Sequence, residues 1–313
     1  MKILAYTDGK ETSLPALRFG AALSVRLSAQ LAVITTRSGT PATEEPPPLA
    51  ESIALCEGVD LTPGIQSLVD AMQTLASDGF ALNQSHIEIH EVRHGYLFFG
   101  QTIAGEPINF YECFGHFVET LNLQVAEHGY DLVVISPPRR RSLPKLMLGD
   151  PARKLALDLD TSLLVVRGGD IDSRVLICAD GSAASRRIFP LLRFLIPALE
   201  GPTALIWVEK PDLDEKATAD AKDLLDHARE WLDNCGKGGE IQHKKGESPR
   251  DVILEEAGED AVIVMGASLR HDVYRRMMGS MTMQVLTRTD SSFLLVKRPP
   301  EADEEYLRDP FSC

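Results

Sequence analysis

The sequence predicts two related α/β domains in tandem, each a doubly wound, five-stranded parallel sheet of Rossmann-like topology. Two observations support this fold class. Strand-like runs at both ends of one half recur in the same order in the other half, and these runs are continuous stretches of Val, Ile and Leu with helical patterns between them. Continuous apolar strands are typical of parallel sheets that helices cover on both faces. A length of 313 residues suits two domains of ordinary size.

The beginnings of the two copies match at an offset of 172 residues. Residues 2–9 and 174–181 each form a short apolar run that a basic residue precedes and Asp-Gly ends. A helical pattern and a second strand-like run, residues 31–35 and 203–208, follow in each copy. We therefore expect the same strand, helix, strand order to open both domains.

The ends of the copies match at a smaller offset of 130 residues. Residues 131–136 pair with 261–266, and the closing runs 162–167 and 292–297 also pair. The difference between the offsets gives the first copy about 42 extra residues. Agreement at both ends, in order, indicates a duplicated domain rather than chance similarity.

These matches define the expected domains. The first copy spans residues 1–169, with insertions at about 37–66 and 92–117, and the second spans 170–298. The boundary falls at the Gly168-Gly169-Asp170 turn. Residues 299–313 form an acidic tail without periodicity, which we expect to be poorly ordered.

Composition excludes several classes of partner. The chain carries 32 Lys and Arg against 46 Asp and Glu, a net charge of −14, which disfavours nucleic acids and anionic membranes. The amino terminus lacks the pattern of a signal peptide, and the five cysteines are isolated, without CxxC spacing. We expect a cytoplasmic protein without a disulfide framework or a structural zinc site.

Three histidines, at positions 86, 90 and 94, recur every four residues, which on a helix would suggest a metal site. The residues between them alternate between apolar and polar, so a strand is expected instead. A strand would spread the histidines over more than about 20 Å. No metal site is predicted.

The first and fourth strands of each copy should supply the ligand site, because doubly wound sheets bind ligands at the carboxyl ends of their strands. Asp8 and Asp180 end the first strands, and Ser136 and Gly266 end the fourth. Over residues 2–298 this pattern resembles the universal stress protein (UspA) family in its tandem form. The shared features are an Asp that closes strand one, an apolar fourth strand that ends in Gly, and a loop of the form G-x-x-G-x9-G-[ST].

The resemblance implies an adenine nucleotide alpha-hydrolase-like fold, a role in the stress response, and ATP or a related adenine nucleotide as cofactor. In ATP-binding members the loop holds the phosphates and the Asp lies beside the adenosine, whereas members without the loop do not bind nucleotide. The second copy has Gly266 and Gly279-Ser280 at the expected spacing, but Leu269 stands where the second glycine belongs. The predicted nucleotide-binding residues of this copy are Asp180, Gly266, Leu269, Arg270, Gly279, Ser280 and Met281.

A structural role for Gly279-Ser280, as a turn followed by a helix N-cap, stays open as an alternative. In the first copy Ser136 and Arg139 replace the two leading glycines. Gly149 is retained, but the acidic Asp150 takes the Ser/Thr place and would satisfy the amides that a phosphate needs. The set Asp8, Arg139 and Gly149 is therefore the weaker candidate, and we expect no ATP site there.

Seven aromatic residues lie between positions 96 and 117. Such density indicates either a covered small core or an exposed surface that meets a partner. The second interpretation gives an alternative function: a regulatory scaffold that binds no nucleotide and uses this segment as its contact surface.

Catalytic motifs are missing from the sequence: it has no Gly-x-Ser-x-Gly elbow, no HExxH and no Walker A lysine. We predict no catalytic residues and at most slow hydrolysis of ATP. Universal stress proteins commonly dimerise through their last strands, so the resemblance implies that residues 163–167 and 293–297 pair within the chain as an internal pseudo-dimer. A homodimer or another protein partner stays open.

Overall fold

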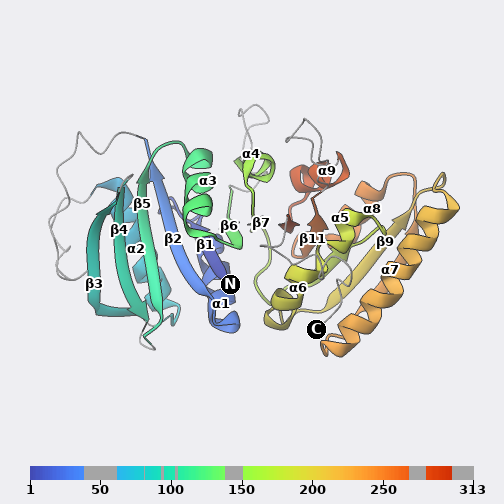
Figure 1. Ribbon diagram of the computed structural model, residues 1–313, viewed down its shortest axis with the longest axis horizontal. Helices are drawn as coiled ribbons and strands as arrows, with labels where there is room; N and C mark the ends of the chain where they lie inside the picture. Colours follow the sequence, from blue (N-terminus) through green and yellow to red (C-terminus); the bar gives the residue numbers. More distant parts are fainter. Residues whose placement is uncertain are drawn as a thin grey trace. The chain divides into compact units, whose positions relative to one another are not determined.

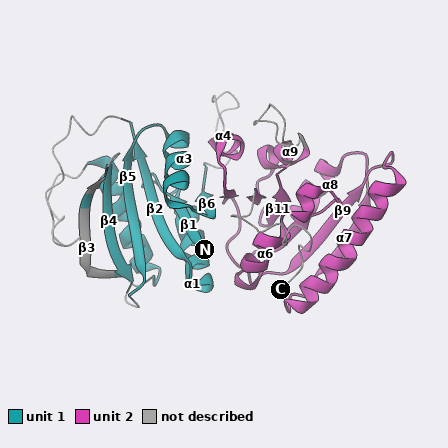
Figure 2. Ribbon diagram, in the orientation of Figure 1, with its two compact units in different colours: residues 1–138 teal, residues 139–313 magenta. Residues whose placement is uncertain are grey.

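The computed structural model describes residues 1–38, 62–80, 82–92, 95–102, 105–137, 151–267 and 280–297. The chain divides into two compact units, residues 1–138 and 139–313 (Figure 2). The acidic tail, residues 299–313, lies outside the described residues. The sequence repeat predicts a domain boundary at 169/170. The two boundaries differ because one strand of the first copy, β7 (Ser162–Val165), pairs with a strand of the second copy inside unit 2.

Unit 1 contains a mostly parallel sheet with helices on its faces (Figure 1). Its described elements are β1 (Lys2–Tyr6), α1 (Leu14–Leu27), β2 (Gln30–Arg37), α2 (Pro63–Ser77), β3 (Leu82–Val92), β4 (Gly95–Thr102), β5 (Pro107–Phe114), α3 (Phe117–His128) and β6 (Leu132–Ile135). The strand order is β6-β1-β2-β5-β4-β3, with β6, β1, β2 and β5 parallel. Strand β1 has three consecutive fully buried residues, Ile3 to Ala5, as the continuous apolar pattern predicts.

Unit 2 contains the whole second copy. Its described elements are α4 (Pro151–Asp158), β7, β8 (Val175–Cys178), α5 (Ala183–Arg186), α6 (Phe189–Leu195), β9 (Thr203–Glu209), α7 (Glu215–Asn234), β10 (Glu240–Lys245), α8 (Pro249–Ala257), β11 (Val262–Gly266), α9 (Ser280–Arg288) and β12 (Ser292–Val296). Strands β10-β9-β8-β11-β12 lie in that order and are all parallel. The predicted five-stranded, doubly wound α/β sheet is confirmed in this copy.

Strands β3 and β4 are the part of the first copy that the second copy lacks. Register shows this: β5 pairs in parallel with β2 just as β10 pairs with β9. The antiparallel pair β4–β3 is added outside β5. The extra strands therefore occupy residues 82–102, so the segment predicted as an insertion at 92–117 begins too late and takes in β5, which both copies share. The other predicted insertion, at about 37–66, lies largely outside the described residues.

The two copies protect the same sheet edge in different ways. In unit 2, β10 is the last strand of the sheet in the described part of the chain, and it carries Lys244 and Lys245. Charged side chains discourage pairing with another strand. In unit 1 the equivalent strand β5 holds the buried aromatic Phe110 and Tyr111, and β4 covers its edge.

The aromatic residues between positions 96 and 117 are mostly buried. Five of the seven are at most 8% exposed: Tyr96, Phe98, Phe110, Tyr111 and Phe114. This confirms the covered-core interpretation. The proposed contact surface is not supported for these five side chains, because buried rings offer a protein partner little surface.

Strands β7 and β12 pair antiparallel in unit 2, with Leu164 opposite Leu294. Their ends are joined in the same way on both sides. The Ser292 hydroxyl accepts a hydrogen bond from the main-chain N–H of Arg167 at 3.1 Å, and the Ser162 hydroxyl accepts one from that of Lys297 at 3.2 Å. The sequence match between the closing runs thus reappears as a local two-fold relation between the two strands. Among the described residues, we find no helix that is both long and apolar enough to cross a membrane.

Candidate functional site

The carboxyl edge of the sheet in unit 2 contains a topological switch point. The chain leaves β8 toward β9 on one side and later returns to β11 on the other, so the connections after β8 and β11 diverge. Doubly wound sheets bind ligands at such a point. Parallel register pairs Cys178 with Ile206 and Ile177 with Val264. The residues that follow these strands, Asp180 and Gly266 among them, therefore meet at one edge.

Asp180 is held by an Asp-Gly turn. Its Oδ1 accepts a hydrogen bond from the main-chain N–H of Ser182 at 3.1 Å. Gly181 has a φ of 78°, and a Cβ at this position would lie only 2.5 Å from the backbone nitrogen of Ala221 in α7. Glycine is required here both for the left-handed backbone and for the close approach of the helix. The turn leaves Asp180 exposed at this edge of the sheet.

The first copy builds the same turn, with one difference. Asp8 Oδ1 accepts from the main-chain N–H of Lys10 at 3.1 Å, and Gly9 has a φ of 73°. The Lys10 ammonium also lies 3.4 Å from Asp8 Oδ2. In the second copy the residue equivalent to Lys10 is the uncharged Ser182. Asp8 is therefore paired with a cation of its own turn, which competes with any ligand group that would approach this carboxylate.

Gly266 has a packing role that sequence reasoning did not anticipate. A Cβ on Gly266 would lie 2.0 Å from the carbonyl oxygen of Ala184 in α5. Its own carbonyl oxygen accepts a hydrogen bond from the Thr282 hydroxyl, in the first turn of α9, at 3.3 Å. The start of α9 is therefore fixed against the end of β11, so the amides at the N-terminus of this helix lie at the carboxyl edge of the sheet.

The structure brings together only part of the predicted set. Asp180, Gly266 and the beginning of α9 lie at the carboxyl edge of unit 2, and Met281 lies partly buried in the first turn of that helix. For Ser280 the structure gives only its place as the first residue of α9. The remaining predicted residues, Leu269, Arg270 and Gly279 in the second copy and Arg139 and Gly149 in the first, lie outside the described residues.

Aromatic side chains fill the equivalent edge of unit 1. Tyr6, which takes the place of Cys178, packs edge-to-face against Phe117 with ring centroids 4.5 Å apart. Burial raises the pKa of Tyr6 above its ordinary value, although a hydrogen bond with Thr36 acts in the opposite direction. Sequence reasoning missed this residue. The signal was available in the repeat, where a large ring in the first copy aligns with a small thiol in the second.

An ion pair near this edge reverses its charges between the copies. In the first copy Arg37 Nη1 lies 3.6 Å from Oε1 of the fully buried Glu112. The same oxygen accepts from the Thr62 hydroxyl at 3.2 Å, and a Cβ on Gly64 would lie 2.0 Å from it, so the first turn of α2 wraps the carboxylate.

At the equivalent positions of the second copy, Glu209 Oε2 lies 2.8 Å from His243 Nε2. The His243 ring stacks on Trp207, with centroids 4.2 Å apart and planes inclined by 10°. Partial burial opposes ionisation of Glu209, but the hydrogen bond from His243 and the charge of Lys245 outweigh it and lower the pKa of this carboxyl. A charged pair thus links β2 to β5 in the first copy and β9 to β10 in the second, with acid and base exchanged.

In the part of the chain that the structure describes, no three His, Cys, Asp or Glu side chains lie close enough together to hold a metal ion. Positions 86 and 90 lie in β3, as the predicted strand requires, and position 94 lies outside the described residues. The described cysteines Cys113, Cys178 and Cys235 form no disulfide. Burial raises the pKa of Cys113 to about 12, which makes this thiol unreactive.

Comparison with known proteins identifies the fold. No family model and no curated protein sequence matches the chain. Among solved structures, a universal stress protein from Archaeoglobus fulgidus DSM 4304 matches with a TM-score of 0.58 and 15% identity, over 95% of this chain and 98% of its own. A putative universal stress protein from Pseudomonas aeruginosa UCBPP-PA14 matches with a TM-score of 0.59 and 14% identity, over 100% and 98%. The chain has the universal stress protein fold.

A protein of unknown function from Pseudomonas aeruginosa PAO1 matches with a TM-score of 0.58 and 13% identity, over 99% of this chain and 96% of its own. These matches extend over almost the whole length of both chains, and 313 residues are enough for two copies of the domain. The predicted resemblance to universal stress proteins is confirmed at the level of the fold.

Proposed function

We propose that this protein acts in the stress response and binds ATP or a related adenine nucleotide at the carboxyl edge of its second copy. The observation that carries the proposal is the placement of α9, whose first turn is tied through Thr282 to the end of β11 at the carboxyl edge of the sheet. Helix N-termini favour phosphate groups, because their main-chain amides lack partners within the helix. Asp180 lies at the same edge and would accept hydrogen bonds from ribose hydroxyl groups.

The first copy contributes no nucleotide site in this proposal. Two observations favour that asymmetry: Asp8 is paired with Lys10, and Tyr6 packs against Phe117 at the edge where the second copy has the smaller Cys178. No hydrolytic residue is assigned.

Isothermal titration calorimetry with ATP and ADP tests the proposal. Ser280→Asp is expected to abolish binding, because a charge about 4 Å from a phosphate opposes it by roughly 4 kcal/mol at an effective dielectric of 20. Ser280→Asn is the matched control, since Asn caps a helix as well as Asp without the charge. Asp180→Asn is expected to weaken binding, and Asp8→Asn in the first copy is expected to leave it unchanged. Heats that are absent for the unmodified protein, or equal for the Asp and Asn variants at position 280, would contradict the proposal.

A scaffold without nucleotide binding is the alternative function. The burial of five of the seven aromatic side chains leaves little of the surface that this alternative relied on. A scaffold would therefore have to use another part of the molecule, and calorimetry without heat from ATP or ADP would favour it.

We also propose that the two copies form an internal pseudo-dimer through β7 and β12. The support is the antiparallel pairing of these strands and the two equivalent serine hydrogen bonds at their ends. Covalent linkage would raise the effective concentration of the two copies to about millimolar. Residues 1–169 and 170–298, expressed separately, should associate when mixed. Sedimentation that shows two folded monomers at millimolar concentration would argue against the pseudo-dimer.

A further inference from the structure

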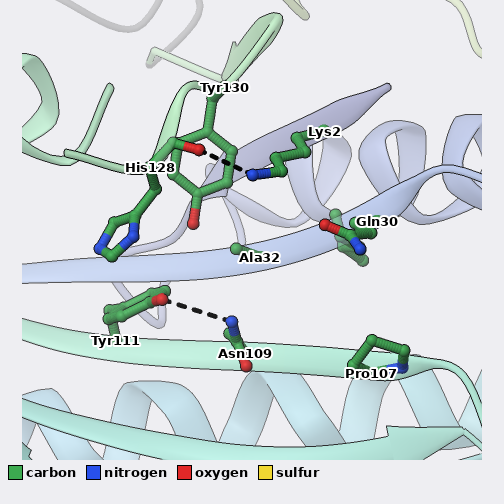
Figure 3. Close-up of a pocket in the computed structure, with 9 residues that line it drawn as sticks. Lys2, Gln30, Ala32, Pro107, Asn109, Tyr111, His128 and Tyr130 are labelled. Atoms are coloured by element: carbon green, nitrogen blue, oxygen red, sulfur yellow. Dashed lines mark hydrogen bonds between the residues drawn. The ribbon is translucent and has the colours of Figure 1, made fainter. Parts of the chain in front are cut away.

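A hollow of about 190 Å³ lies at the amino ends of the strands of unit 1, the edge opposite the candidate site (Figure 3). Ala32 of β2 and Asn109 of β5, which are opposite each other in register, form part of its lining. Helix α3 ends at His128 and does not extend over these strand ends. The small side chain of Ala32 in the lining leaves room for the hollow.

The second copy has a hollow at the equivalent place. Its lining includes Arg174, Ala204 and Glu240, which occupy the positions of Lys2, Ala32 and Asn109 in the repeat. The hollow is therefore a feature of the fold, and only its lining differs between the copies. In the second copy the lining contains two carboxylates, and Glu240 lies 3.5 Å from the guanidinium of Arg174.

Three rings line the hollow of the first copy. The His128 ring lies 5.6 Å from that of Tyr111, inclined by 31°, and 6.1 Å from that of Tyr130, inclined by 66°. Asn109 Nδ2 donates a hydrogen bond to the Tyr111 hydroxyl at 3.3 Å. Burial raises the pKa of Tyr111, so its phenol stays protonated near neutral pH. The wall is therefore aromatic and carries neutral polar groups.

A cation stands at the rim without an acid in the lining. Lys2 Nζ donates to the carbonyl oxygen of His128 at 3.0 Å, which caps the end of α3 (Figure 3). This bond takes one of the three donors of an ammonium group. None of the nine lining residues is Asp or Glu, although the chain carries a net charge of −14. Asp131 is outside the lining and accepts from the main-chain N–H of Lys2 at 2.8 Å.

We propose that this hollow binds a small aromatic carboxylate, with its ring against His128 and the two tyrosines and its carboxylate at Lys2. Size agrees with this class: 190 Å³ corresponds to about six waters at roughly 30 Å³ each, enough for one ring and a carboxylate but too small for a nucleotide. Aromatic walls with a few placed polar groups are typical of small-molecule sites. The site is independent of the proposed nucleotide site, which lies in the other unit.

Titration of the full-length protein with 4-hydroxybenzoate, followed by ligand-observed NMR and calorimetry, tests the proposal. Ala32→Leu is expected to abolish binding because the added side chain fills the hollow. Lys2→Met is expected to weaken it about fivefold, as for loss of one exposed ion pair. The matched controls are Ala204→Leu and Arg174→Met, the same positions in the second copy, and both should leave binding unchanged.

The neutral analogue 4-hydroxybenzamide and the ring-free acetate separate the two parts of the recognition, and both should bind more weakly than 4-hydroxybenzoate. Equal affinity of either one would overturn the proposal, as would no binding of 4-hydroxybenzoate at millimolar concentration. Loss of binding in Ala204→Leu, or full binding in a folded Ala32→Leu protein, would place the ligand elsewhere. If Ala32→Leu fails to fold, Lys2→Met decides, because Lys2 is exposed and its loss should not unfold the sheet.

Discussion

Replacing Gly181 with alanine is expected to destabilise unit 2 strongly. Its φ of 78° is left-handed, which costs an L-residue about 1–2 kcal/mol. The new Cβ would lie 2.5 Å from the backbone nitrogen of Ala221, so α7 would have to move, and overpacking of this kind costs about 1–3 kcal/mol. Together these give a loss of about 2–5 kcal/mol in the free energy of unfolding.

Tryptophan fluorescence in urea measures this loss directly. The chain has two tryptophans, Trp207 and Trp231, and both are buried in unit 2. With a slope of about 2 kcal/mol per molar urea, the midpoint of the fluorescence transition should fall by about 1–2.5 M.

The repeat supplies the control for this experiment. Gly9 has nearly the same φ, 73°, and an added Cβ would lie 2.6 Å from the Ser67 hydroxyl and 3.1 Å from the backbone Cα of Ser67 in α2, a less close backbone approach than at Gly181. Gly9→Ala should therefore cost less than Gly181→Ala. The loss falls in unit 1, which holds no tryptophan, so circular dichroism in urea measures it. A Gly181→Ala midpoint equal to that of the unmodified protein would refute the reasoning. An equal fall in Gly9→Ala would show that the cost does not come from the approach to α7.

Two further predictions concern buried charges. Burial lowers the pKa of Lys297 to about 8, so the unfolded chain binds more protons than the folded one between pH 8 and the ordinary value of 10.5. Across this window the free energy of unfolding should rise with pH by up to about 3 kcal/mol more than that of the Lys297→Met variant. Urea titrations at several pH values measure it, and a difference between the two proteins that does not change with pH would contradict the prediction. Glu112→Gln should destabilise unit 1 by about 3–5 kcal/mol, because it leaves the Arg37 charge beside a buried neutral group. Glu209→Gln, in the more exposed pair with His243, should cost less than about 1 kcal/mol. Circular dichroism melting measures both losses, and equal losses would disprove the role assigned to burial.

The duplication and the α/β class could be predicted from the sequence because both depend on local pattern. Apolar runs that end in Asp-Gly and recur in order predict buried parallel strands, and the register of β8, β9 and β11 agrees with that prediction. The role of Asp-Gly at the edge of the sheet was also readable, since the carboxyl end of strand one is a ligand position in such folds.

The boundary of the insertion could not be read from aromatic density. The segment between positions 96 and 117 stands out in composition, yet β5 within it belongs to the shared fold and only β3 and β4 are additional. Strand pairing is a long-range property, so a local run of Phe and Tyr does not reveal which neighbour each strand will take.

The sequence by itself determined the α/β fold class and the strands that carry Asp8 and Asp180, because periodicity and turn residues act over a few positions. Only the tertiary structure decided that Gly181 and Gly266 are required by helices packed against them, that Tyr6 closes the edge in one copy, and that a hollow lies behind His128. These features depend on which backbones approach each other at distances of a few ångströms. Such contacts join residues far apart in the chain, and no local pattern records them.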